Sequence, residues 1–168
     1  MKCLLIIDVQ NGFVSAKTEH IVPRLKQLLE QFQNAPVFAT KFINHGGPFK
    51  NYMNNWSRFK TSPEIDVLPF VESRADAIIE KNIYSACSPE ILEMFRDRGI
   101  DEVYIAGIDT DCCVLKTALD LFEANIRPIV LADYCASNGG EESHAAALTV
   151  LVRNIGRAQV YDKAYPGF

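Results

Sequence analysis

Apolar runs alternate with amphipathic stretches along the whole sequence, and this alternation is what most constrains the fold. The first run, Lys2–Val9, is almost continuously apolar, as expected of a strand buried on both faces of a parallel sheet. Similar strand-like runs are Pro36–Phe42, Ala75–Glu80, Glu102–Ala106, Pro128–Ala132 and Ala158–Tyr161. Apolar positions three and four apart predict helices over Ile21–Gln33, Pro89–Arg98, Cys113–Ala124 and Glu141–Asn154. This order predicts an α/β fold, a three-layer αβα sandwich around a six-stranded, mostly parallel, Rossmann-like sheet.

Length and charge limit what such a fold can be used for. The chain has 168 residues, 17 Lys and Arg against 21 Asp and Glu, and a formal net charge of −4. We expect one domain over residues 1–168, and the acidic balance without a Lys/Arg run excludes a nucleic-acid-binding surface. No apolar stretch reaches the roughly 18 residues that span a membrane. Met1–Asp8 is too short for a secretory signal, so we expect a soluble, cytoplasmic protein.

The cysteines do not suggest a disulfide framework. There are five of them, an odd number, at no regular spacing. Neither CxxC nor a Cys/His zinc spacing occurs, and a chain of this length folds without staples. We therefore expect at least one thiol to be present for its reactivity.

A long connection, Asn44–Leu68, interrupts the alternating pattern. It contains Gly46, Gly47, Pro48 and Pro63 together with the aromatic residues Phe49, Tyr52, Trp56 and Phe59. Connections of this length are usually functional, which predicts a pocket wall or a subunit contact. The alternative is a surface excursion with a short helix packed on its own domain.

Two charged residues stand at strand ends, where ligands bind in parallel sheets. Asp8 ends the first strand beside Gln10 and Asn11, and it is either a turn-bracing residue or an acid/base group. Lys81 ends the third strand, where a buried ammonium needs a carboxylate partner such as Asp8; the alternative is a solvated surface charge. Asp133 follows the fifth predicted strand and either braces the next turn or lines the site.

The strongest candidate follows the fourth strand, in the segment Gly107–Val114. A glycine turn and two capping residues lead into a helix that begins near Cys112 or Cys113. A thiol in the first turn lies near the positive end of the helix dipole, which predicts a lowered pKa and a more available thiolate. The two thiols point about 100° apart on a helix, so only one can face a given pocket. Both could also be packing residues, or could form a strained vicinal disulfide.

A cysteine nucleophile needs a base, and the histidines are poor candidates. None of His20, His45 and His144 follows a strand. We therefore expect Asp8 to take the thiol proton while Lys81 keeps the local field positive.

Four segments, in this order, resemble the isochorismatase-like cysteine hydrolases, a family that includes nicotinamidases, N-carbamoylsarcosine amidohydrolases and isochorismatases. The segments are LLIIDVQNGF, IIEKNIYSAC, VYIAGIDTDCCVLKTALDLF and IVLADYCAS, and the resemblance covers essentially the whole chain. It implies Asp8 as base, Lys81 as cationic partner and Cys113, which directly precedes Val114, as nucleophile. It also implies a cis peptide bond between Ile108 and Asp109, with the backbone N–H groups of Asp109 and Cys113 as the oxyanion hole.

The departures from the family concern metal and substrate. Nicotinamidases carry a metal site after the second strand, built from an aspartate and histidines, whereas this chain has a lone histidine, His45, in that segment. Zinc takes three or four protein ligands, so we expect no metal and no cofactor, and nicotinamide becomes a less favoured substrate. The family commonly forms dimers or larger assemblies, which implies a homo-oligomer here.

These features lead to one leading hypothesis, a metal-independent cysteine hydrolase that cleaves an amide, imide or carbamoyl C–N bond of a small molecule. Two alternatives stay open, namely an isochorismatase-type hydrolase of a vinyl ether and a catalytically silent interaction module with the same fold. We expect Gln10, Phe13, Trp56 and Tyr84 to line the substrate pocket. Cys3, Cys87 and Cys135 are interpreted as packing residues.

Overall fold

The computed structural model describes residues 1–163 of the chain. One sheet contains six strands, β1 (Lys2–Ile7), β2 (Val37–Phe42), β3 (Ala77–Lys81), β4 (Glu102–Ile108), β5 (Arg127–Ala136) and β6 (Val160–Tyr161). The α-helices in this range are α1 (Val22–Gln31), α2 (Pro48–Tyr52), α3 (Pro69–Glu72), α4 (Pro89–Asp97), α5 (Leu115–Glu123) and α6 (Glu141–Ile155). There are also 3-10 turns at Glu19–Ile21 and Arg157–Gln159, and a π-helical turn at Thr110–Val114.

The strand order is β3-β2-β1-β4-β5-β6, and every pairing between neighbours is parallel. This confirms the predicted α/β sandwich, with a sheet that is parallel throughout rather than mostly so. The order reverses between β1 and β4, so the chain leaves these two neighbours toward opposite sides. Ligand sites of open parallel sheets lie at this reversal, beyond the carboxyl ends of the strands.

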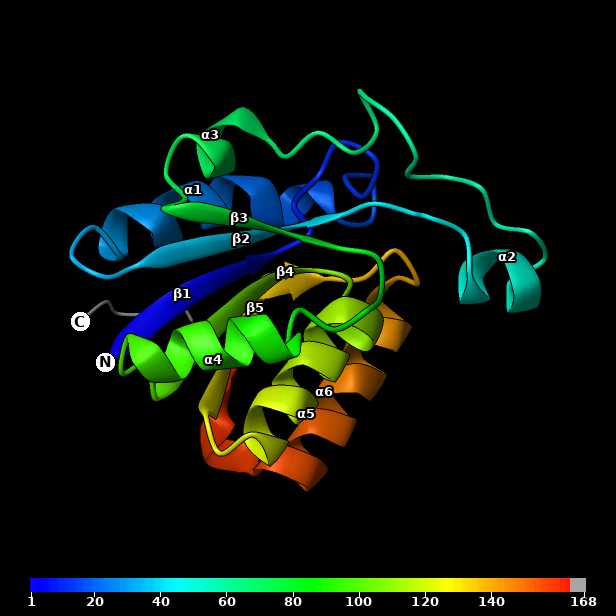
Figure 1. Cartoon of the computed structure of the whole chain (residues 1–168). Helices are drawn as coiled ribbons and strands as arrows, with labels where there is room; N and C mark the ends of the chain where they lie inside the picture. The colour runs from blue at the N-terminus through cyan, green and yellow to red at the C-terminus, as the bar shows by residue number, and fades with distance from the viewer. Residues whose placement is uncertain (164–168) are drawn as a thin grey trace.

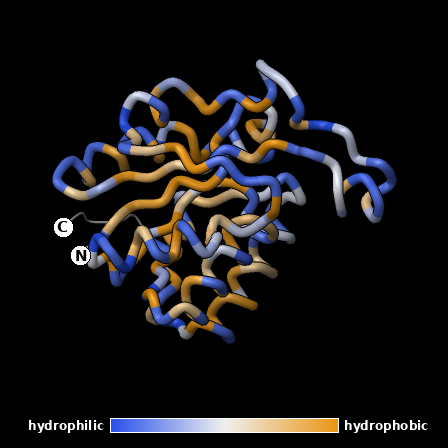
Figure 2. The backbone as a smooth tube through the Cα atoms, viewed as in Figure 1, coloured by the Kyte–Doolittle hydropathy of each residue, from blue (hydrophilic) through white to orange (hydrophobic). Residues whose placement is uncertain are grey.

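Helices cover both faces of the sheet (Figure 1), and an apolar layer lies between each face and its helices. On β1, Leu4 and Ile6 pack with α1 and α3, whereas Leu5 and Ile7 pack on the other face with α4, α5 and α6. Alternate residues of a strand point to opposite faces, so a continuous apolar run serves both layers. Figure 2 shows the hydrophobic residues concentrated in the central strands. No helix of residues 1–163 has the length and apolar character needed to cross a membrane.

The structure corrects two predicted boundaries at the edge where the candidate residues lie. Strand β5 continues to Ala136, so Asp133 stands inside the strand rather than after it. The register between β4 and β5 shifts between Ile105 and Gly107, which accommodates this extension. The helix expected from Cys113 begins as an α-helix only at Leu115, after the π-helical turn.

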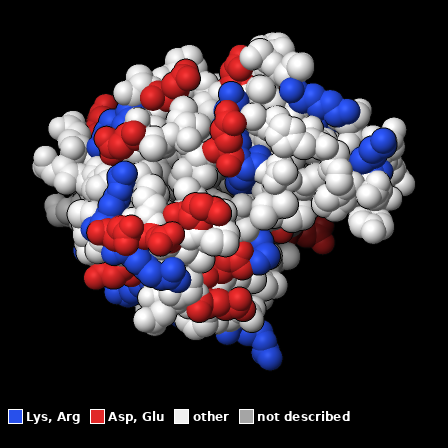
Figure 3. Space-filling model, viewed as in Figure 1, with Lys and Arg blue, Asp and Glu red and all other residues white. Residues whose placement is uncertain are grey.

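The long connection, residues 44–68, carries α2 away from the sheet, on the right in Figure 1. Its base is held by an aromatic cluster in which Phe42, Phe49 and Phe59 are buried and Phe13 and Trp56 pack against them. Acidic and basic side chains are interspersed over the visible face of the strands and helices (Figure 3).

Gly107 makes a close approach that a side chain would prevent. Its φ is +129°, and a Cβ there would lie 2.1 Å from the carbonyl oxygen of Ile7 on β1. We expect Gly107→Ala to lower the free energy of unfolding by about 3 kcal/mol or more, because strain and a backbone clash add. Gly99 is the matched control, since its φ is +64° but a Cβ added there would meet no atom within 4 Å. Gly99→Ala should cost about 1 kcal/mol in urea unfolding, and equal losses for both variants would contradict this account.

Candidate active site

Asp8 is placed by the turn that ends β1. Its φ is +49°, and its side chain is fully buried. The hydroxyl of Thr40, on the neighbouring β2, donates to Oδ1 of Asp8 at 2.6 Å and accepts from the Asp8 backbone N–H at 2.9 Å. These two hydrogen bonds with Thr40 fix the orientation of the carboxylate, and its second oxygen, Oδ2, takes part in neither of them.

Lys81 is the last residue of β3, and its side chain crosses the end of β2 to reach Asp8. Its Nζ lies 2.7 Å from Oδ2 of Asp8, 5.2 Å from the centre of the Phe42 ring, and donates to the carbonyl oxygens of Ile83 and Tyr84 at 3.0 and 3.1 Å. Both side chains of the ion pair are buried, with exposed fractions of 4% and 0%. Of the two alternatives for Lys81, a buried pair with a carboxylate and a solvated surface charge, the structure contains the buried pair. Oδ2 of Asp8 receives no well-directed hydrogen bond from the described residues, which leaves a lone pair available.

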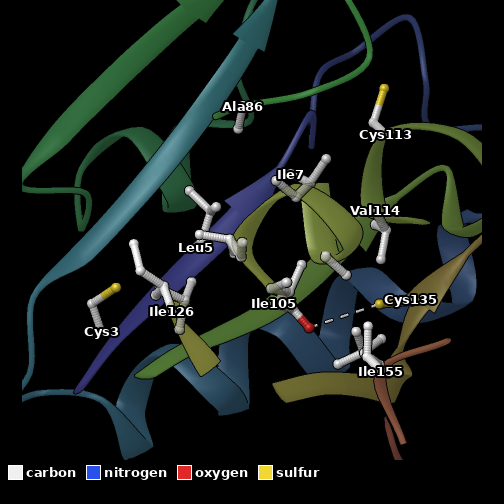
Figure 4. Packing of buried hydrophobic residues seen from close by; sticks show 14 of the residues in the cluster. Cys3, Leu5, Ile7, Ala86, Ile105, Cys113, Val114, Ile126, Cys135 and Ile155 are labelled. Atoms are coloured by element: carbon white, nitrogen blue, oxygen red, sulfur yellow. Dashed lines mark hydrogen bonds between the residues drawn. The ribbon is translucent and has the colours of Figure 1, made fainter. Parts of the chain in front are cut away.

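Cys113 lies in the π-helical turn after β4, with its Sγ 3.4 Å from the ammonium of Lys81. The residue is only 5% exposed. In Figure 4 its sulfur points away from the apolar cluster, whereas the side chain of Val114 turns into that cluster. Cys112 is half-buried, and no hydrogen bond from its sulfur to Lys81 or Asp8 is found among the described residues. The structure thus brings Asp8, Lys81 and Cys113 together, and Cys112 takes part in none of the hydrogen bonds that it gives between them.

Charges in this cluster shift each other's proton affinity. Burial alone would lower the pKa of Lys81, but the neighbouring charges of Asp8 and Cys113 reverse that effect and raise it. Burial and the carboxylate of Asp8 raise the pKa of the Cys113 thiol well above its usual range, against the opposing ammonium. The lowered thiol pKa expected from a helix start is therefore wrong for this site. The resting group is a neutral thiol beside an ion pair, because burial and a nearby anion outweigh the helix end.

The peptide bond between Ile108 and Asp109 is cis, as the resemblance implies. It lies where β4 ends and the π-helical turn begins. The side chain of Asp109 is turned toward the loop after β5, where its Oδ1 accepts hydrogen bonds from the backbone and side-chain amides of Asn138.

Gln10, which we expected in the pocket wall, has another place. It is fully buried, and its Nε2 donates to the carbonyl oxygens of Phe42 and Ile65, while its Oε1 accepts from the Phe42 N–H. An amide whose donors are both bound to backbone inside the protein braces the strand ends. The correction is that Gln10 joins the turn after β1 to β2 and to the long connection.

Two of the three aromatic candidates for the pocket wall, Phe13 and Trp56, belong to the aromatic cluster, and the third, Tyr84, contacts it through Phe49. Phe13 stacks on Phe59 with ring centres 3.9 Å apart, and Trp56 lies 6.1 Å from Phe42. Tyr84 meets Phe49 edge-on at 5.4 Å and is 38% exposed. Phe42 connects this cluster to the ammonium of Lys81.

The remaining thiols are core residues or their neighbours. All five cysteines are free. Cys3 and Cys135 are buried within one apolar layer and Cys87 packs against it, and burial raises the pKa of each of these three thiols to about 12. These groups stay protonated and unreactive at neutral pH.

The residues present do not fit the metal site that the resemblance attributes to nicotinamidases. His45 is exposed, and the amide of the preceding Asn44 donates to the carbonyl oxygens of Trp56 and Arg58. Within residues 1–163, no three His, Cys, Asp or Glu side chains gather closely enough to hold a metal ion. His144 instead lies 2.8 Å from the hydroxyl of Thr110, in the turn that carries Cys113.

Two partners of the site were not predicted from the sequence. Thr40, which orients Asp8, follows the apolar residues 37–39 of β2, and that change from apolar to polar was the available signal. Asn138, which binds Asp109, lies in a loop and carries no comparable signal.

The sequence matches the isochorismatase domain family model over residues 2–160. It is 29% identical over 171 residues to the nicotinamidase/pyrazinamidase of Mycobacterium tuberculosis, a match that covers 87% of this chain and 92% of that protein. Over 83 residues it is 41% identical to the uncharacterized isochorismatase family protein PncA of Bacillus subtilis, covering 49% of this chain and 44% of that protein. Among solved structures, N-carbamoylsarcosine amidase from Thermoplasma acidophilum superposes with a TM-score of 0.82 at 22% identity, covering 99% and 98% of the two chains, and shows the same fold.

The buried ion pair makes a quantitative prediction. Lys81→Met leaves the Asp8 carboxylate buried without its partner, which should cost about 3–5 kcal/mol of unfolding free energy at pH 7. The loss should shrink toward pH 5, because an unpaired buried carboxylate has a raised pKa and takes up a proton. Asp8→Asn in the same chain should recover most of the loss.

Lys41→Met on β2 is the matched control for this measurement. Lys41 lies 3.9 Å from Glu80, whose side chain is 66% exposed. An exposed pair of this kind contributes about 0–1 kcal/mol. Urea unfolding that finds equal losses for the two lysine variants would refute the assigned importance of the buried pair.

Proposed function

The chain belongs to the isochorismatase family of hydrolases, and from that premise we propose that it is a metal-independent cysteine hydrolase of a small molecule's C–N bond, in an amide, imide or carbamoyl group. The observation that supports this most is the contact of Lys81 with both Asp8 at 2.7 Å and Cys113 at 3.4 Å. These three groups are a base, a cation and a nucleophile within reach of one reacting carbonyl. Their removal from water strengthens each electrostatic interaction between them.

In the first half of the proposed reaction, Sγ of Cys113 attacks the carbonyl carbon while its proton passes to Oδ2 of Asp8. The negative charge that develops on the carbonyl oxygen is stabilised by the backbone N–H groups of Asp109 and Cys113. When the tetrahedral intermediate collapses, the C–N bond breaks and the protonated Asp8 gives its proton to the leaving nitrogen. An amine or ammonia departs and a thioester on Cys113 remains.

In the second half, water takes the place of the departed amine. Asp8 removes a proton from this water as it attacks the thioester carbon. The thiolate then leaves and regains the proton from Asp8, which releases the acid and restores the neutral thiol.

The shifted pKa values suit this cycle. A raised pKa of Cys113 keeps the resting nucleophile protonated, so the proton moves only when a substrate is present. Lys81 stays charged because its own pKa is raised, and its ammonium lies 2.7 Å from Oδ2 of Asp8. The ammonium therefore acts as a fixed positive charge and transfers no proton.

We assign the pocket wall to Phe13, Trp56 and Tyr84. The first two belong to the aromatic cluster that adjoins Lys81 through Phe42, and Tyr84 packs on Phe49 of that cluster. Their flat apolar faces suit a small substrate with a planar or apolar body. We place the enzyme in the cytoplasm. We also propose that it is a homo-oligomer of two or more copies, and a monomer mass measured by light scattering in solution would contradict this assembly.

The nucleophile is tested by a pair of adjacent substitutions. We expect Cys113→Ala to lower turnover at least about 1,000-fold, as removal of a covalent nucleophile does elsewhere. Cys112→Ala should retain turnover within about threefold, because no hydrogen bond joins its sulfur to Lys81 or Asp8 among the described residues. Release of amine or ammonia from a panel of small amides, ureas and carbamoyl compounds measures both variants. Full turnover by Cys113→Ala would exclude the thioester route, and a vinyl ether assay would then be the next measurement.

Trp56→Ala tests the pocket wall. We expect KM to rise about 3- to 10-fold with kcat within about twofold, since the ring would bind substrate and transition state alike. Phe122→Ala is the control, because this aromatic residue is 49% exposed on α5 and belongs to no part of the cluster. Unchanged kinetics in Trp56→Ala, with the fold intact by circular dichroism, would remove Trp56 from the site.

A further inference from the structure

Asn138, in the loop between β5 and α6, uses each of its polar groups to join loops at the carboxyl edge of the sheet. Its Nδ2 donates to the carbonyl oxygen of Phe13 at 3.1 Å and to Oδ1 of Asp109 at 2.9 Å. Its Oδ1 accepts from the hydroxyl of Ser15 at 2.8 Å, and its backbone oxygen accepts from Lys17 at 3.1 Å. One side chain therefore connects the loops that follow β1, β4 and β5.

Asp109 is the partner of Asn138 on the loop after β4. Its Oδ1 accepts the backbone N–H of Asn138 at 2.7 Å as well as the side-chain amide. Burial, together with smaller contributions from the charges of Asp111 and Asp8, raises the pKa of this carboxyl to about 6, against the hydrogen bonds from Asn138, which lower it. A half-buried carboxylate among other acids is costly, and two N–H donors on one oxygen are what offset that cost here.

A second bond ties the same two loops together one turn further along. The hydroxyl of Ser137 donates to Oδ1 of Asp111, two residues before Cys113. The loop after β5 thus holds the nucleophile-bearing turn at Asp109 and Asp111, and holds the loop after β1 at Phe13. Asp8 and Cys113 belong to the two segments, after β1 and after β4, that the loop after β5 joins.

We propose that Asp109, acting through Asn138, is a positioning residue of the hydrolase: its carboxylate fixes the backbone of the Ile108–Asp109 turn, where the oxyanion donor is assigned, relative to the loop that follows Asp8. The inference rests on the proposed function, because it concerns the geometry of that reaction. Asp109 touches neither Lys81 nor the sulfur of Cys113 through any hydrogen bond among the described residues. Its effect is on the placement of the backbone amide, and not on the supply of a proton.

The first experiment compares Asp109→Ala, Asn138→Ala and the double variant. Each single change should lower kcat about 10- to 100-fold with KM within about threefold, since losing an oxyanion donor outright costs about 100- to 1,000-fold. The double variant should be no worse than the poorer single variant, because both residues act through one contact. Asp109→Asn keeps an oxygen acceptor for Asn138 and should retain kcat within about threefold. Glu142→Gln, an exposed acid on α6, is the control for removing a carboxylate nearby.

The second measurement separates positioning from general damage to the site. Alkylation of Cys113 by iodoacetamide at a fixed pH forms one S–C bond, expels iodide and needs no oxyanion donor. Its rate should stay within about twofold of the wild type in Asp109→Ala and Asn138→Ala, although turnover falls. Cys113→Ala, followed by mass spectrometry, identifies the modified thiol.

Each outcome tests either the positioning role of Asp109 and Asn138 or the proposed hydrolase function. A kcat of Asp109→Ala within twofold of the wild type would overturn the positioning role, as would alkylation that falls in parallel with turnover. Multiplicative losses in the double variant would overturn the coupling of the two residues. Absence of any turnover by the wild-type protein, or full turnover by Cys113→Ala, would instead overturn the proposed function, and the positioning role with it.

Discussion

The ion pair between Lys81 and Asp8 is the interaction on which the rest of the site depends. A carboxylate with no exposed surface cannot stay ionised without a partner, and an ammonium at the end of β3 cannot stay buried without one. The pair forms across β2, which lies between β1 and β3 and ends at Phe42, the residue that pairs with Lys81 and whose ring lies 5.2 Å from its ammonium. The order of three parallel strands therefore determines which charge can reach which.

Much of this arrangement could be predicted from the sequence, because strand ends in a parallel sheet meet at one edge. Asp8 and Lys81 stand at the ends of predicted strands, Cys113 begins the predicted helix after the fourth strand, and the structure brings their side chains into contact. The proton affinity of Cys113 could not be predicted in the same way. A helix start is visible in the sequence, whereas the depth of burial and the distance to Asp8 depend on the packed fold, and these two effects prevail.

Side chains that brace the site were harder to recognise than those proposed to react. Gln10 carries the polar groups expected of a pocket, but its amide is bound to the backbone of Phe42 and Ile65. Nothing in a sequence tells whether an amide faces a ligand or a neighbouring strand, because both choices satisfy its hydrogen bonds. Asn138 shows the converse, since a loop residue without any pattern joins three loops through its hydrogen bonds.

Phe42 contacts both the charged residues at the edge of the sheet and the aromatic residues of the long connection. These two parts are held in place by different kinds of contact. On one side the Phe42 ring lies 5.2 Å from the ammonium of Lys81, and on the other it packs edge-on against Phe49 and Phe59. The charged residues are held by buried hydrogen bonds and by backbone contacts as close as that of Gly107 to Ile7, so their geometry tolerates little change. The aromatic residues of the long connection touch the site through apolar contacts alone, which tolerate substitution at roughly constant volume. If the proposed function holds, we therefore expect differences in substrate preference to arise in residues 44–68 while Asp8, Lys81 and Cys113 keep their positions.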